Sequence, residues 1–161
     1  MEKNDNTALS RMQHVDDALD QYEKSIGLPE FSEDASNEDV KKYLQMTREQ
    51  MELLSIEDCA QAALMLSGYC FYLQRCYNRE ISRINWAKGV LSKLVSGTEA
   101  QYRGSWDSQY HQAINNNDYA KKVLGLKNYA QQRADRLTFL ATSVRSISDL
   151  LVNLQRAKVM K

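Results

Sequence analysis

Apolar residues recur at steps of three and four through most of the chain, which is the pattern of an amphipathic helix. The first such stretch runs from Thr7 to Ile26 and ends at the sequence Gly27-Leu28-Pro29. Residues 30–37 that follow are acidic and lack this periodicity, so they are expected to form a linker.

Three matches to a capping box mark further helix starts, because a side chain and a residue three positions later can satisfy the first free amides of a helix. The matches are Ser36 with Asp39, Thr47 with Gln50, and Ser55 with Asp58. The first two predict short helices near residues 38–45 and 48–54. The third opens the longest pattern in the chain.

From Ser55 to Ser96 one seam of apolar positions continues without interruption, and Glu80 is its only polar member. The seam consists of Ala63, Leu66, Cys70, Leu73, Tyr77, Glu80, Ile84, Ala87, Leu91 and Leu94. A heptad pattern of this length predicts a coiled-coil-like helix of about 60 Å.

A connection at residues 97–117 follows, with a short helix expected from Trp106 to Ile114. Asp118 is expected to cap a second long helix that runs to about Lys158. Its clearest apolar positions are Leu137, Leu140, Val144, Ile147, Leu151 and Leu154. Two long helices joined by one connection predict an antiparallel hairpin in an all-α fold.

Further apolar residues lie outside these two seams, and one hairpin cannot cover them all. They include Leu64, Ile81, Val90 and Leu150. We therefore expect the chain to form a homo-oligomer, with the six-residue seam from Leu137 to Leu154 as the oligomerisation contact.

Charge divides the chain sharply, although the total is zero. Residues 1–58 hold 15 acidic and six basic side chains, a net charge of −9, and residues 59–161 hold six acidic and 15 basic, a net charge of +9. Together with the helix pattern, this suggests an acidic N-terminal helical segment (1–54) and a basic hairpin region (55–161). A basic surface favours a polyanionic partner, and the acidic segment could modulate that surface or contact another partner. The alternative is that the two segments neutralise each other within a fold or an oligomer.

Signals of enzyme chemistry are missing from the sequence, so no catalytic residue or cofactor is predicted. The six glycines are isolated, and neither a phosphate-binding loop nor a zinc-protease motif occurs. The neighbouring acids Asp16 and Asp17 point in different directions on a helix, and are interpreted as a solvated face. Glu57 and Asp58 are interpreted as helix-start charges.

No metal site is expected from three cysteines without a C-x-x-C pair and only two histidines. The thiols are interpreted as reduced. Without a signal sequence or a membrane-spanning run, the protein is expected in the cytoplasm, or in the host cytoplasm if it is viral.

Basic and aromatic residues share one face of the first long helix. Tyr72, Arg79, Trp86 and Lys93 occupy the same heptad position, and Arg75, Arg83 and Lys88 lie on neighbouring positions. Guanidinium and ammonium groups neutralise phosphates, and aromatic rings stack on bases, so this combination suits single-stranded nucleic acid.

The same chemistry continues at the expected tip of the hairpin, with Arg103, Trp106, Lys121 and Lys122. The alternative is that the aromatic residues pack the corner of the hairpin or an oligomer contact while the charges keep the surface soluble.

This layout resembles the UvsY-type recombination mediators of tailed phages over residues 60–161. The resemblance rests on the stretch Arg83-Ile-Asn-Trp86-Ala-Lys88, on Lys93-Leu-Val-Ser96-Gly97, and on the return helix from Asp118 to Lys161. It implies a ring-shaped oligomer that binds single-stranded DNA and loads a RecA-like recombinase past single-strand binding protein. It also implies Lys88 and Lys93 as DNA contacts, with Arg103 and Lys121 in second place.

The leading hypothesis is therefore a single-stranded-DNA-binding accessory protein of recombination or replication. The alternative, from another class, is a phage structural or assembly protein, such as a virion component, a packaging adaptor or a scaffold. In that case the basic face would contact acidic protein.

Overall fold

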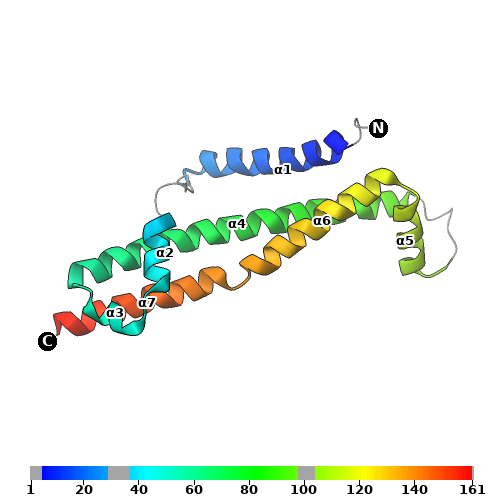
Figure 1. Ribbon diagram of the computed structural model, residues 1–161. Helices are drawn as coiled ribbons and strands as arrows, with labels where there is room; N and C mark the ends of the chain where they lie inside the picture. Colours follow the sequence, from blue (N-terminus) through cyan, green and yellow to red (C-terminus); the bar gives the residue numbers. More distant parts are fainter. Residues whose placement is uncertain (1–4, 29–36, 98–103, 161) are drawn as a thin grey trace. The chain divides into compact units, whose positions relative to one another are not determined.

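The computed structural model describes residues 5–28, 37–97 and 104–160, and these residues form seven helices and no strand (Figure 1). The expected all-α fold is confirmed. The helices are α1 (Asp5–Ser25), α2 (Asn37–Gln45), α3 (Arg48–Leu53), α4 (Ile56–Ser96), α5 (Trp106–Asn115), α6 (Asp118–Leu137) and α7 (Leu140–Val159).

Contacts divide the helices into two compact units. Unit 1 takes its residues from 1–29 and 78–135, and unit 2 from 30–77 and 136–161. The boundary falls inside α4, which continues through it as one helix of 41 residues. The units follow packing, whereas the sequence division after residue 54 followed charge, so the two describe different properties.

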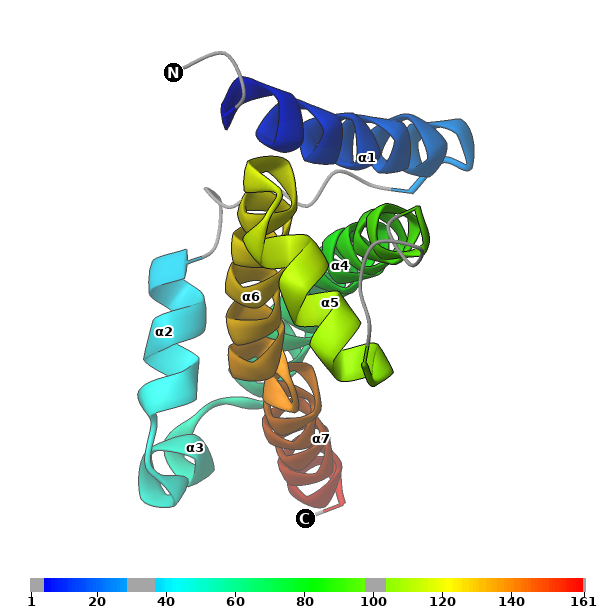
Figure 2. The same ribbon diagram turned by 90° about the vertical axis from the view of Figure 1, so that its right-hand side faces the viewer.

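In unit 1, α1 and α6 pack against the second half of α4, and α5 crosses the ends of α4 and α6 (Figure 2). Contacts of Glu80 with Arg133 and of Leu91 with the cluster around Val123 show that α4 and α6 run antiparallel. The buried cluster consists of Ala8, Ala87, Leu91, Ile114, Ala120 and Val123. The end of α4, α5 and the start of α6 therefore lie together, as a hairpin tip requires.

Unit 2 packs α2, α3 and α7 against the first half of α4. Ser148 donates a hydrogen bond to the carbonyl of Ala63 at 2.8 Å, and the Cys70 thiol donates to that of Ala141 at 3.3 Å. These contacts make α4 and α7 antiparallel. The buried cluster consists of Val40, Met51, Ala62, Ala63, Leu66, Cys70, Leu73, Val144 and Leu151.

Two of the expected capping boxes are confirmed. The Thr47 hydroxyl accepts from the Gln50 amide while the Gln50 side chain accepts from the Thr47 amide. Ser55 and Asp58 exchange equivalent bonds at the start of α4, and the hydrogen bond from Ser55 lowers the pKa of Asp58. Ser36 lies outside the described residues, as do residues 30–36 of the expected linker.

The expected cap of α6 was wrong by one residue. The side chain of Asn117, rather than Asp118, accepts the hydrogen bond from the Ala120 amide at 3.1 Å. Asp118 is the first residue of α6 and pairs with Lys121 on the helix surface.

The expectation of one unbroken second helix was also wrong. The helix ends at Leu137, and α7 begins at Leu140. Between them Phe139 adopts a left-handed backbone conformation with φ of 67°, the only non-glycine residue in the described chain with a positive φ. A left-handed residue cannot continue a right-handed helix, which accounts for the break.

The seam of α4 is confirmed as a buried face. Eight of its ten positions are buried, and Tyr77 and Leu94 are partly buried. In α7, Val144 and Leu151 are buried within unit 2, and Leu137, Ile147 and Leu154 pack against the same cluster, while Leu140 is exposed. This seam therefore serves the chain's own core, and its expected part in an oligomer stays a prediction.

Candidate nucleic-acid interface

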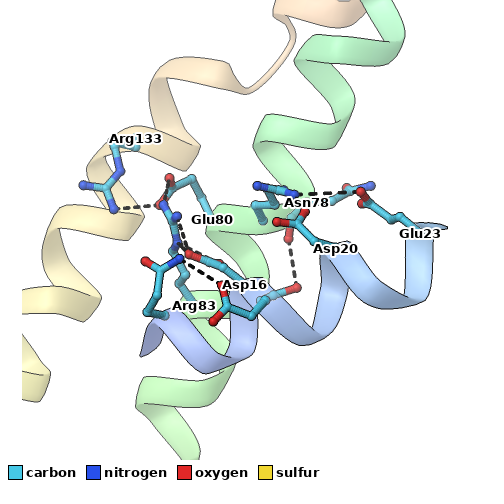
Figure 3. Close-up of polar contacts among 11 residues, drawn as sticks. Asp16, Asp20, Glu23, Asn78, Glu80, Arg83 and Arg133 are labelled. Atoms are coloured by element: carbon cyan, nitrogen blue, oxygen red, sulfur yellow. Dashed lines mark hydrogen bonds and ion pairs between the residues drawn. The ribbon is translucent and has the colours of Figure 1, made fainter. Parts of the chain in front are cut away.

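Two of the predicted DNA-binding arginines face α1 within unit 1. Arg79 and Arg83 are one helical turn apart on α4, so they lie on the same side of it. Arg83 donates hydrogen bonds from two nitrogens to Oδ2 of Asp16 on α1, from Nη2 at 2.6 Å and from Nε at 3.1 Å (Figure 3). This hydrogen bonding raises the pKa of Arg83 above its usual value, against the opposing effect of desolvation.

Arg79 pairs with two further acids of α1. Its Nη2 forms a close ion pair with Asp20 and lies 3.8 Å from Oε2 of Glu23. The three acids Asp16, Asp20 and Glu23 follow one another at steps of four and three residues, so they form one line along α1 (Figure 3). A line of carboxylates on α1 thus faces a line of guanidinium groups on α4.

Glu80, the one charged residue in the seam of α4, forms ion pairs with two arginines. It is buried, and its Oε1 accepts from Nη1 of Arg83 at 2.5 Å. The other carboxylate oxygen of Glu80, Oε2, lies 2.9 Å from Nη2 of Arg133 on α6. This contact is an ion pair, but its geometry is not that of a hydrogen bond. The network therefore balances two carboxylates with two guanidinium groups and joins α1, α4 and α6 (Figure 3).

The interpretation of Asp16 as part of a solvated face was wrong. Only 3% of Asp16 is exposed, and it lies between the helices beside Arg83. By contrast, Leu9 and Tyr22, which belong to the apolar stripe of α1, are 52% and 60% exposed. The orientation of α1 therefore places its acids against α4 and leaves part of its apolar stripe exposed to solvent.

Lys88 and Lys93 lie nearer the C-terminal end of α4 than the two arginines, on a part of the helix that is open to solvent. The exposed residues along it are Asn85, Lys88, Gly89, Ser92, Lys93 and Ser96. None of these six residues is acidic, and the four that are not lysine have small, uncharged side chains. Neither lysine forms an ion pair with a described residue. We call this surface the lysine face.

The other predicted contacts are spread over both units. Trp86 is partly buried against the cluster of unit 1, whereas Trp106, at the start of α5, is half exposed. Lys121 pairs with Asp118 at 3.2 Å, and Lys122 is partly buried. Arg75 belongs to unit 2 and is also partly buried. Arg103 lies outside the described residues.

Other kinds of site find little support in the part of the chain that the structure describes. It contains no group of three or more His, Cys, Asp or Glu side chains placed to hold a metal ion. All three cysteines are free, and burial raises the pKa of Cys70. None of the described helices has the length and apolar character needed to cross a membrane.

No protein-family model, curated protein or solved structure matches this chain. The candidate interface therefore rests on its own geometry.

The contact between α1 and α4 was missed at the level of sequence, although a signal for it exists. Acids recur at 16, 20 and 23 on one helix, and arginines recur at 79 and 83 on another. Both lines have the helical period, so two such helices can pair along their length. Periodicity does not reveal which distant helix is the partner, and that information came only from the packing.

Proposed function

We propose that this protein binds single-stranded DNA and acts as a non-enzymatic accessory factor in recombination or replication. The observation that carries the proposal is the lysine face of α4, an exposed cationic surface without an acidic residue. Its small side chains leave the helix surface accessible to an approaching strand. Ammonium groups there bind phosphates without reading sequence.

Trp106 supports the choice of a single strand over a duplex. Its ring is half exposed at the start of α5, in the same unit as the lysine face. An exposed indole can stack on an unpaired base, which contributes roughly 1–3 kcal/mol per base in proteins of this kind. Bases in a duplex are already stacked on each other.

The more specific role, that of a mediator loading a RecA-like recombinase past single-strand binding protein, is proposed from the resemblance to UvsY-type proteins alone. Such a role consumes no cofactor. It requires a binding surface that is repeated in an oligomer, because several weak sites together hold a flexible strand.

The first test measures the fluorescence anisotropy of a labelled oligothymidylate with the protein at about 50 and about 200 mM salt. Lys88→Ala combined with Lys93→Ala removes two phosphate contacts. We expect affinity to fall roughly 10-fold or more at the lower salt, and the slope of log K against log salt to become flatter by about 1.4.

The matched control is Lys41→Ala with Lys42→Ala. It removes the same two ammonium groups from exposed positions of α2, where Glu38 and Asp39 stand in the first turn. Binding should stay close to that of the unchanged protein. Equal affinity of all three proteins for the oligonucleotide would refute the assignment of the lysine face.

A second candidate, the assembly protein, is favoured by one observation: Arg79 and Arg83 already bind carboxylates of a protein helix. If the basic surface serves acidic protein, the full chain should bind labelled polyglutamate more tightly than oligothymidylate. If it serves DNA, the preference should be reversed. Fluorescence anisotropy with the two labelled polymers distinguishes these results.

A further inference from the structure

The carboxylates of α1 form ion pairs with Arg79 and Arg83 of α4, as the phosphates of a nucleic acid could. We propose that the surface of α4 beneath α1, formed by Arg79 and Arg83, is a second binding surface for single-stranded nucleic acid, and that α1 covers it as an internal competitor. This inference rests on the proposed function, since it assigns further residues to the same ligand.

Charge shows what α1 conceals. Without Asp16, Asp20 and Glu23, the three guanidinium groups of Arg79, Arg83 and Arg133 face only one carboxylate, that of Glu80. The surface then has a local net charge of +2. Together with Lys88 and Lys93 on the same half of α4, these residues of α4 and α6 offer a net charge of +4 to a polyanion.

The hydrogen bonding of Arg79 leaves capacity for another ligand. Its Nε is buried and donates to no described acceptor, while Nη2 contacts Asp20 and Glu23. A phosphate can accept from Nε and Nη2 together, in the bidentate geometry that guanidinium groups favour. The carboxylates of α1 therefore fill this site incompletely.

The attachment of α1 is weighted toward ion pairs. Met12 and Ala8 are buried, whereas Leu9 and Tyr22 are more than half exposed, so part of the apolar surface of α1 contributes nothing to the contact. Ion pairs with partly exposed side chains weaken as salt or a competing polyanion is added. A nucleic-acid strand is such a competitor.

The experiment uses the full chain with Asp20→Asn and Glu23→Gln, which we call the release variant. Both changes keep side-chain shape and leave the buried Asp16 pair in place, and circular dichroism verifies that helicity is unchanged. We expect its affinity for the labelled oligothymidylate to rise roughly 10-fold at about 50 mM salt.

The matched control is Asp17→Asn with Asp135→Asn. It removes the same two negative charges from exposed positions of unit 1, where Asp17 lies near His14 and Asp135 accepts from Gln131. A change in overall charge would tighten binding in both variants alike. Release of Arg79 tightens it only in the first.

A second comparison identifies Arg79 as the group set free. Arg79→Gln should weaken binding little in the unchanged protein, because α1 covers the side chain there. Introduced into the release variant, it should abolish most of the gain. Similar effects in both backgrounds would overturn the proposal.

The outcomes also separate this inference from the proposed function. If the unchanged protein binds DNA through Lys88 and Lys93 but the release variant binds no tighter than its control, the covered surface is refuted alone. If no variant binds the oligonucleotide, both proposals are wrong. Tighter binding of polyglutamate without tighter binding of the oligonucleotide would assign the surface to acidic protein instead.

Discussion

Among single residues, Arg83 joins α1 to α4 through ion pairs with two buried carboxylates. It is the centre of a mostly buried network, in which Asp16 and Glu80 are almost inaccessible to water. Transfer of a charge out of water costs several kcal/mol unless partners replace the solvent. The three side chains therefore stabilise unit 1 only as a set.

Arg83→Ala should lower the free energy of unfolding by about 3–5 kcal/mol, since it leaves Asp16 buried without its partner. Urea unfolding followed by circular dichroism measures the loss. Arg136→Ala serves as the control, because Arg136 is exposed on α6 and its removal should change stability by less than about 0.5 kcal/mol. A loss below about 1 kcal/mol for Arg83→Ala would mean that water or Arg133 replaces the missing partner.

At the scale of elements, the break between α6 and α7 is the least expected feature. Phe139 holds the left-handed conformation that favours glycine and asparagine, and 77% of the residue is exposed. An aromatic residue there gains little from burial and bears the backbone cost. It also lines a small hollow in unit 2 beside Leu73, Tyr77 and Leu137.

Phe139→Asn should raise the free energy of unfolding by about 0.5–1 kcal/mol, because asparagine tolerates a positive φ far better. Thermal unfolding should then shift upward by about 1–4 °C. Phe139→Val provides the opposite comparison, since a β-branched residue is the least suited to this conformation and should destabilise. A loss of stability with asparagine would show that the Phe139 ring contributes more to packing than its exposure indicates.

Much of this helix plan could be predicted from the sequence. Periodicity located α1, the short helices and the full length of α4, and hydroxyl residues with a partner three positions on marked two of the starts. The break at Phe139 could not be predicted, because neither glycine nor proline marks it. Local propensity therefore gives no signal for it.

Prediction of the candidate site was less complete for the same reason. The exposure of Lys88 and Lys93 followed from their distance from the seam. The covering of Arg79 and Arg83 did not, since the acids of α1 that pair with them are more than 50 residues away in the chain. The spacing of residues shows which of them share a face of a helix, but it does not show which other helix packs against that face.

At the scale of the whole molecule, a considerable apolar surface stays outside both buried clusters. Leu64 and Phe71 are seven residues apart on α4, on the same side of the helix, and are 76% and 58% exposed. Neighbouring apolar side chains on one helix face are typical of contacts between protein copies. We predict that these two residues contribute a contact to the expected homo-oligomer, in addition to the seam of α7.

Leu64→Asp with Phe71→Asp should reduce the mass measured by light scattering, because two charges would be buried in the contact. Val159→Asp with Met160→Asp is the comparison, as both residues are exposed at the end of α7 and should leave the mass unchanged. A monomeric mass for the unchanged protein would contradict the prediction of an oligomer.

The division of α4 between two units has a consequence for synthesis on the ribosome. All residues of unit 1 have been translated by position 135, whereas unit 2 waits for α7, which supplies Val144 and Leu151 to the cluster around Leu66. Until α7 is in place, the apolar side chains on the first half of α4 are accessible to chaperones and to other nascent chains. A chain released early, near codon 136, would therefore contain all residues of unit 1 and expose the apolar first half of α4 to aggregation.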